Sequence, residues 1–196
     1  MLWQNGKILF LEDHLERLEK SCKYFSCQYS REKIDQLLEK EERAFQKRHV
    51  YRLRLSLSVC GNHLELKVTD ITANQGWGKD QLRVLVSEKA LNSQDPYLYH
   101  KTDCRKLYND EFKRCIEQGF DEVLFFNEKG FLCEGAISSV FIKKSDSWFT
   151  PSLACGLLPG TWRKQMLQEL NTKEAELSRE DLNAAEEIRI GNSVRL

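Results

Sequence analysis

The sequence predicts a two-lobed α+β protein, because strand and helix patterns are mixed in two blocks that a turn-rich segment separates. Its 196 residues are enough to bury about 70 % of the unfolded surface, in one domain or two small lobes. We expect a small α/β lobe over residues 1–87, a linker over 88–99 and a larger lobe over 100–196. The linker is predicted because turn-forming residues gather in it: Asn92, Ser93, Asp95 and Pro96.

The first block opens with a predicted hairpin over residues 1–10, since Asn5-Gly6 is a strong turn signal between two short strands. Asp13 followed by Glu16 has the spacing of an N-cap and its capping-box partner, so a helix is expected to begin there. Ser30 is expected to cap a second helix.

A second hairpin follows these helices. From Tyr51 to Val59, apolar residues alternate with arginine and serine, which is typical of a strand with one buried face. Gly61-Asn62 predicts a turn into a second strand, over residues 64–68. Another short strand is expected over residues 82–86.

The second block again mixes helices and strands. Helices are predicted over about 105–118, after Gly160, and after Ser178, which is followed by Asp181 in capping-box spacing. Strands are predicted over residues 121–127, 131–134, 139–143, 148–150 and 187–190.

The composition excludes several classes of function. Thirty basic and thirty acidic residues give formal neutrality, so no global field favours nucleic acid or an anionic membrane. No apolar run has the length of a membrane span, and no signal-peptide pattern follows Met1, which indicates a cytoplasmic protein. Seven cysteines without paired C-x-x-C spacing argue against a disulfide framework and a structural zinc site. The four histidines lack metal-ligand spacing, so no metal is expected.

Two residues of the second block have patterns that suit catalysis. Lys101 follows the apolar-aromatic run Tyr97-Leu98-Tyr99, so its backbone is expected to enter a buried region. A desolvated lysine has a lowered pKa and is a usable amine near neutrality, whereas a lysine without such neighbours is a surface charge. Glu134 ends an otherwise apolar strand, where it is either a functional carboxylate or a strand-end surface residue.

Other residues suit the binding of anions. Gly160-Thr161 opens a helix, whose N–H groups and dipole form an anion site, or else makes a simple N-cap turn. Arg52 and Arg54 point to the same side of their strand, where they would bind substrate carboxylates or protect an edge strand from aggregation. Arg105, four residues after Lys101, is a further substrate-binding candidate.

Five motifs in one order carry a family resemblance. They are H-x-x-R ending at Arg17, H-K-T-x-x-R around Lys101, E-G-A-x-S-S-x-F from Glu134, C-G-L-L-P-G-T-x-R ending at Arg163 and G-N-S-V-R ending at Arg195. In these motifs the chain resembles the fold-type IV enzymes of pyridoxal 5′-phosphate (PLP), which include branched-chain and D-amino-acid aminotransferases and 4-amino-4-deoxychorismate lyase. The motifs look most like the lyase branch.

The resemblance implies a D-amino-acid aminotransferase-like fold, PLP as cofactor and roles for individual residues. Lys101 falls on the lysine that binds PLP covalently and acts in catalysis, and Glu134 falls on the glutamate at the ring nitrogen. The remaining residues that match cofactor contacts are Arg17, Leu158, Gly160, Thr161, Asn192 and Ser193. Many relatives carry asparagine where this chain has Ser139.

The resemblance further implies a small-molecule substrate and a homodimer. A lyase releasing p-aminobenzoate and pyruvate for folate synthesis is the first expectation, and a branched-chain or D-amino-acid aminotransferase is the second. A catalytically degenerate PLP-binding protein is the third, because the chain looks shortened at its N-terminus relative to the family. A dimer would also cover strand edges such as Met1–Gln4, which a short small lobe is expected to leave open.

Overall fold

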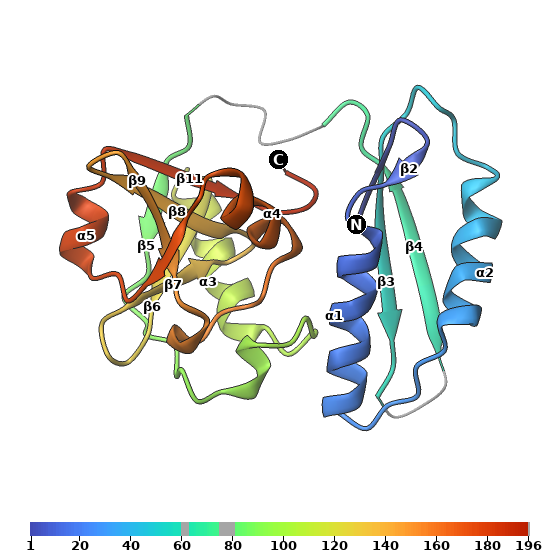
Figure 1. The fold of residues 1–196 in the computed structure, drawn as a ribbon, viewed down its shortest axis with the longest axis horizontal. Coiled ribbons are helices and arrows are strands. Elements are labelled where there is room, and N and C mark those ends of the chain that lie inside the picture. The colour runs from blue at the N-terminus through green and yellow to red at the C-terminus, as the bar shows by residue number, and fades with distance from the viewer. Residues whose placement is uncertain (60–62, 75–80, 196) are drawn as a thin grey trace. The chain divides into compact units, whose positions relative to one another are not determined.

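The chain divides into two compact units, as a computed structural model of residues 1–59, 63–74 and 81–195 describes it. The first unit comprises Met1–Gly78 together with Ser193–Arg195, and the second comprises Lys79–Asn192. Figure 1 shows the elements of each unit along the chain. The predicted turn at Gly61-Asn62 lies outside the described residues.

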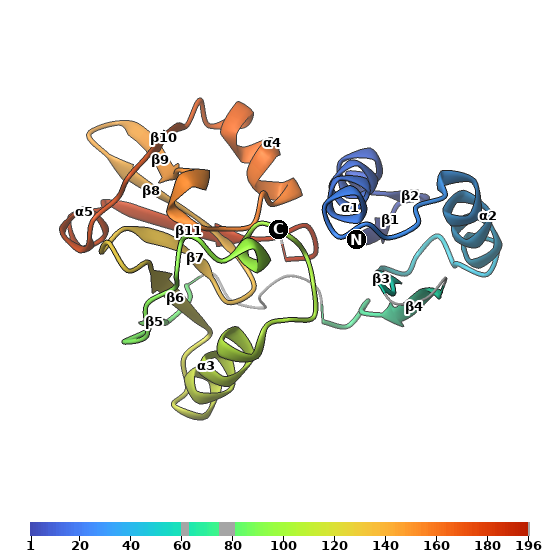
Figure 2. The same cartoon turned by 90° about the horizontal axis from the view of Figure 1, so that it is seen from below.

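The first unit is an antiparallel sheet of order β2-β1-β3-β4 with two helices. Both helices lie on one face of the sheet, as Figure 2 shows, and the core between them contains Trp3, Leu15, Ile34 and Leu53. Ser30 caps the second helix as predicted, because its hydroxyl accepts the N–H of Lys33. The elements are β1 (Leu2–Gln4), β2 (Lys7–Ile8), α1 (Leu11–Tyr24), α2 (Arg31–Glu42), β3 (Tyr51–Leu57) and β4 (Leu64–Asp70).

The predicted start of the first helix is wrong. Helix α1 begins at Leu11, and its N-cap is Phe10 in the left-handed conformation (φ 55°), without a side-chain cap. Asp13 therefore lies inside the first turn, where a carboxylate is favoured by the helix dipole rather than by a capping bond. Glu16 pairs instead with Lys20, one turn later, at 2.7 Å.

Two further expectations about this sheet are wrong, one about an open edge at β1 and one about the length of β3. Strand β1 is paired on both sides, with β2 and with β3, so Leu2–Gln4 is not an open edge and does not itself call for a dimer. Strand β3 ends at Leu57, and Val59 is 56 % exposed, because the chain leaves the sheet before the predicted alternation ends.

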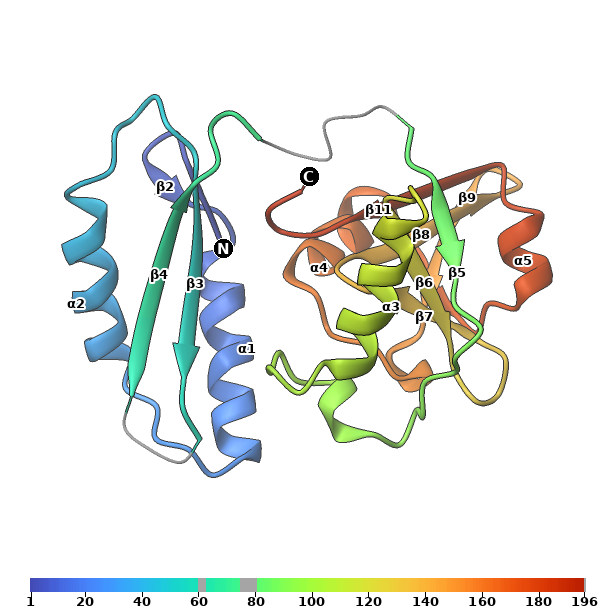
Figure 3. The same cartoon turned by 180° about the vertical axis from the view of Figure 1, so that it is seen from behind.

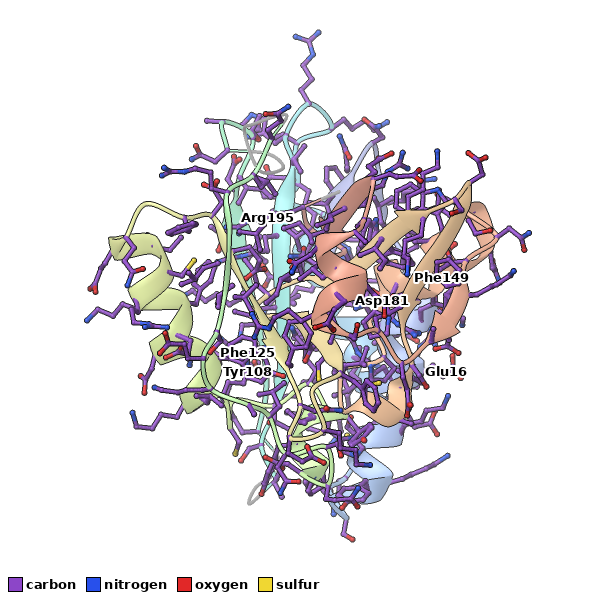
Figure 4. All side chains as sticks on the ribbon, turned by 90° about the vertical axis from the view of Figure 1, so that its left-hand side faces the viewer. Glu16, Tyr108, Phe125, Phe149, Asp181 and Arg195 are labelled. Carbon is purple, nitrogen blue, oxygen red and sulfur yellow. The ribbon has the colours of Figure 1, made fainter. Side chains whose placement is uncertain are left out.

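The second unit contains a sheet of order β5-β6-β7 and a sheet of order β10-β9-β8-β11. Figure 3 shows α3 lying over the strands of the smaller sheet. Phe125 from β6 packs edge-to-face on Tyr108 from α3, with ring centroids 4.9 Å apart (Figure 4). The elements are β5 (Val84–Val86), α3 (Lys106–Glu117), β6 (Glu122–Phe126), β7 (Leu132–Gly135), β8 (Ser139–Lys144), β9 (Ser147–Pro151), α4 (Thr161–Glu169), β10 (Lys173–Ala175), α5 (Arg179–Asn183) and β11 (Glu187–Gly191), with short 3-10 turns at Pro96–Leu98 and Leu153–Cys155.

The predicted linker over residues 88–99 belongs instead to the second unit. Strand β5, which precedes this segment, pairs in parallel with β6. Within the segment, Leu91 bridges to Asn127, and both Leu91 and Leu98 are buried in the core of this unit. The turn-forming residues shape this packed segment rather than separating two lobes, so the predicted boundaries at 87 and 100 are wrong.

The α+β class is confirmed, and one strand was not predicted. Strand β10 pairs in parallel with β9 although Lys173-Glu174-Ala175 has no apolar pattern. No described helix is long and apolar enough to cross a membrane. The six cysteines within the described ranges are free thiols, and no cluster of His, Cys, Asp or Glu there could hold a metal ion.

Candidate active site

The most unusual polar group of the second unit is the carboxylate of Glu134, at the end of the fully buried strand β7. Only 8 % of Glu134 is exposed. Its Oε1 accepts the hydroxyl of Tyr108 at 2.8 Å, and its Oε2 accepts the backbone N–H of Leu158 at 3.3 Å. Helix α3 and the loop before α4 thus fix both oxygens, so the carboxylate has a single well-defined orientation.

Burial raises the pKa of Glu134 to about 7. The hydrogen bond from Tyr108 opposes this rise, and so do the positive charges of Lys101 and Arg105 and the N–H of Leu158. A carboxyl group with this pKa exchanges its proton near neutrality. It is therefore suited to bind a cationic N–H group, whose charge would hold it in the ionised form.

Lys101 lies in the loop between the turn at Pro96–Leu98 and α3. Its side chain is exposed, which contradicts the expected desolvation. The aromatic run before it is buried only in part, because Leu98 is in the core while Tyr97 is largely exposed. Lys101 acts on Glu134 through its charge, which lowers the pKa of that carboxyl. Lys101 and Glu134, both in the second unit, are therefore close enough for their charges to interact.

Arg105 stabilises the loop that follows Glu134. Its guanidinium donates to the carbonyl of Ala136 and lies over the ring of Tyr108, with 4.9 Å between Cζ and the ring centroid. These contacts engage one N–H and one face of the guanidinium with the protein itself. A role for Arg105 in substrate binding stays a prediction.

Glu122 is a second buried carboxylate, which sequence reasoning did not find. It is 0 % exposed and accepts the N–H groups of Ala136 and Ile137 and the hydroxyl of Ser138, at 3.0, 3.2 and 2.6 Å. A Cβ on Gly135 would lie 2.9 Å from the Glu122 carboxyl carbon, so only glycine fits after Glu134. Glu122 therefore shapes the loop of the E-G-A-x-S-S motif.

The predicted anion site lies where helix α4 begins. Gly160 is the N-cap of this helix, and Thr161 is buried at its first position. A Cβ on Gly160 would lie 2.8 Å from the hydroxyl oxygen of Ser139, so the helix start has no room for a side chain at position 160. The N–H groups of a first helical turn and the helix dipole favour a phosphate.

Asn192 follows β11 and holds the loop after Glu134 from another side, since its amide donates to the carbonyl of Ile137 at 2.8 Å. Ser193 groups with the first unit. The carbonyls of Ala136 and Ile137 are thus bound by Arg105 and Asn192, while their N–H groups are bound by Glu122.

The remaining predicted residues lie in the first unit. Arg17 is half-buried on α1, with 3.5 Å between its Nη2 and Nδ1 of His14, so the H-x-x-R pair shares a helix face as expected. Arg52 and Arg54 are both exposed on β3. The edge-strand alternative fails at Arg52, because this residue has partners on β1 and β4. Substrate binding by the pair stays a prediction.

Comparison with known proteins gives the same family for the whole chain. A family model described as amino-transferase class IV matches residues 1–196. A Schizosaccharomyces pombe protein named "Putative aminodeoxychorismate lyase" is 28 % identical, over a match that covers 97 % of this chain and 83 % of that protein. A crystal structure titled as a "Putative amino-acid aminotransferase" from Mesorhizobium loti is 32 % identical and has a TM-score of 0.86, covering 100 % of this chain and 93 % of that one.

A third comparison concerns the cofactor. A Mycobacterium tuberculosis structure described as a hypothetical aminotransferase in its PLP-bound form covers 100 % of this chain and 76 % of its own, with 20 % identity and a TM-score of 0.80. This likeness is one of fold. Since the family model spans every residue of the sequence, the chain belongs to the class IV aminotransferases, a family of PLP enzymes.

Proposed function

We propose that the chain is a PLP-dependent 4-amino-4-deoxychorismate lyase, which releases p-aminobenzoate and pyruvate. One observation carries the proposal: Glu134 is a buried carboxylate, 8 % exposed, whose two oxygens are fixed by the hydroxyl of Tyr108 and the N–H of Leu158. The positive charge of Lys101 acts on the same carboxylate. The lyase name of the S. pombe relative supports the choice of reaction. A folate-pathway role and a homodimer belong to the same proposal and rest on the resemblance. A cytoplasmic location also belongs to it and rests on the sequence prediction.

The residues of the second unit fit PLP by their chemistry. The ring nitrogen needs an acidic partner to stay protonated, and Glu134 is a buried carboxylate suited to that contact. The phosphate needs backbone N–H donors, which the start of α4 at Gly160-Thr161 would supply. Lys101 would hold the cofactor covalently. Leu158 and Asn192 complete the proposed cofactor contacts of this unit. Contacts from Arg17 and Ser193, which belong to the first unit, rest on the family motifs alone.

The proposed roles of the residues follow from this arrangement. When bound, PLP supplies an electron sink for a substrate carbon that loses a proton. Lys101 would hold the cofactor until the substrate binds, and its amine would then be the base for the proton on the carbon that bears the nitrogen. Glu134 keeps the ring nitrogen protonated throughout. Cleavage of the bond between the ring carbon and the ether oxygen would then release the enolate of pyruvate, which takes up a proton to become pyruvate. The substrate ring would become aromatic, which drives the step forward.

An aminotransferase is the second candidate, and the 32 % identity with the M. loti protein favours it. The first proton transfer would be the same. Lys101 would then act as the acid that returns the proton, because an ordinary amino acid has no leaving group next to the carbon that loses its proton. The structure of the substrate therefore determines whether the lyase or the aminotransferase reaction follows, more than the residues described above do.

Product analysis tests the proposed reaction. With PLP and 4-amino-4-deoxychorismate, we expect p-aminobenzoate and pyruvate in equal amounts, no requirement for a 2-oxo acid and little accumulation of pyridoxamine phosphate. Chromatography of the products measures all three. Faster formation of glutamate from 2-oxoglutarate and a donor amino acid would establish the aminotransferase instead. PLP binding without either turnover would show a degenerate binder.

Arg17 tests the proposed phosphate contacts. A hydrogen bond to a charged group contributes about 1.5–3 kcal/mol, so Arg17→Ala should weaken PLP affinity by about 10- to 100-fold. Equilibrium dialysis measures the affinity. Lys20→Ala is the matched control, because it removes an exposed cation from the same helix, and its affinity should equal that of the wild type. Unchanged affinity in Arg17→Ala would make Arg17 an ordinary surface arginine.

A further inference from the structure

Tyr108 is a buried polar residue to which neither the sequence motifs nor the proposed mechanism assigns a task. It lies on the inner side of α3 and is 8 % exposed. Its hydroxyl donates to Oε1 of Glu134 at 2.8 Å across 26 residues of sequence. Its ring is held between Phe125, in edge-to-face contact at 4.9 Å, and the guanidinium of Arg105. The hydroxyl position is thus set by packing on both sides.

The two hydrogen bonds of Glu134 favour its ionised form for a geometric reason. A carboxylate accepts at both oxygens, whereas a carboxylic acid must donate from one of them. Oε2 faces the N–H of Leu158, which cannot accept a hydrogen bond. A proton on Oε1 could bind only the oxygen of Tyr108, and the hydrogen bond that this hydroxyl donates to Oε1 would then be lost. Burial and the neighbouring Glu134 charge raise the pKa of the Tyr108 hydroxyl, so this group remains a proton donor.

We propose that Tyr108 is a positioning residue, whose hydroxyl orients the Glu134 carboxylate and keeps it ionised for the ring nitrogen of the cofactor. This inference rests on the role of Glu134 in the proposed function. Tyr108 would act through Glu134 and needs no contact with the substrate. Arg105 supports this role from the far side of the ring and through the Ala136 carbonyl.

The test is a titration of the Glu134 carboxyl in the full chain without PLP. Glutamate labelled with ¹³C at the carboxyl carbon is incorporated, and the Glu134 signal is assigned by its loss in Glu134→Gln. The wild-type midpoint should lie near 7. In Tyr108→Phe the midpoint should rise by about one pKa unit, a tenfold change in the protonation equilibrium. An unmoved midpoint would overturn the proposal.

Tyr99→Phe is the matched control. It also removes one tyrosine hydroxyl from the second unit, but that hydroxyl donates to the carbonyl of Ser93 at 2.8 Å and not to Glu134. Its Glu134 midpoint should equal that of the wild type. If Tyr99→Phe shifted the midpoint as far as Tyr108→Phe does, the effect would come from general loosening of the core, and the proposal would be wrong.

A fluorinated side chain keeps the test independent of folding defects in Tyr108→Phe. Replacing Tyr108 by 3-fluorotyrosine makes the hydroxyl a stronger donor with almost no change of shape. The Glu134 midpoint should then move in the opposite direction, downward. No shift, or an upward shift, would contradict the proposal.

The complex with PLP gives a second readout that separates this inference from the proposed function. With ¹⁵N-labelled PLP, the nitrogen chemical shift reports protonation of the ring nitrogen. The protonated fraction above pH 7 should fall in Glu134→Gln and, by a smaller amount, in Tyr108→Phe. An effect in Glu134→Gln alone would overturn the role of Tyr108 only. No effect in either variant would overturn the role of Glu134 as well.

Discussion

Lys101→Ala should abolish covalent PLP binding and lower turnover by at least about 10⁴-fold, because the proposed mechanism gives this amine both the cofactor bond and the proton transfer. The visible absorption of the bound cofactor should be lost, while the far-ultraviolet circular dichroism should not change, since Lys101 is exposed in an irregular loop. Absorption spectra and product formation measure the two effects.

Lys106→Ala is the matched control for this variant. Lys106 is an exposed lysine at the start of α3 that pairs with Asp110, so its removal should leave absorption and turnover at wild-type levels. Added alkylamines should restore part of the turnover of Lys101→Ala, because a small amine can replace the missing base. Full activity of Lys101→Ala without added amine would contradict the assignment.

Glu134→Gln should slow turnover by about 10²- to 10³-fold, the usual cost of losing one preorganised charged group in an active site. The same substitution should increase the stability of the fold above neutral pH. The pKa of Glu134 is raised from 4.5 to about 7 in the folded chain. The folded state therefore binds more protons than the unfolded state between these values, and stability falls as the pH rises through this window.

The size of the stability effect follows from the same pKa. At 1.36 kcal/mol per pKa unit, holding Glu134 ionised above pH 7 destabilises the chain by at most about 3 kcal/mol. Glu134→Gln without PLP should therefore unfold at higher urea concentration than the wild type at pH 8, but not at pH 4.5. Urea titrations at both pH values measure this.

Glu117→Gln controls for the loss of one negative charge. Glu117 lies at the exposed end of α3, so its removal should leave turnover unchanged and should not raise the urea midpoint at pH 8. If Glu134→Gln were less stable than the wild type at pH 8, the buried charge would be stabilising, and the explanation of its raised pKa would be wrong.

Local sequence patterns correctly predict those helices and turns whose hydrogen bonds join residues close together in the sequence. The capping box of Ser178 and Asp181 is present at the start of α5, because all of its hydrogen bonds lie within four residues. Asp13 has a similar spacing, but the hairpin before it brings Phe10 into the left-handed conformation and starts the helix earlier. Strand β10 depends on a distant parallel partner and has no pattern of its own.

The candidate site could be predicted only where a motif is contiguous. Glu134 was recognised from its own strand and its motif. Tyr108 contacts Glu134 from 26 residues away, and Glu122 contacts Ala136 from 14 residues away. Local spacing in the sequence does not predict such contacts. The exposure of Lys101 was also beyond prediction, because an aromatic run indicates burial of its own side chains and not of the residue that follows.

Mapping of the reduced cofactor adduct tests most directly whether this chain binds PLP through Lys101. The protein is incubated with PLP, treated with borohydride, digested and examined by mass spectrometry. We expect one peptide carrying the reduced cofactor, with the modification on Lys101, and no such peptide from Lys101→Ala. A cofactor found on another lysine, or spread over several lysines in both proteins, would contradict the assignment of the active site.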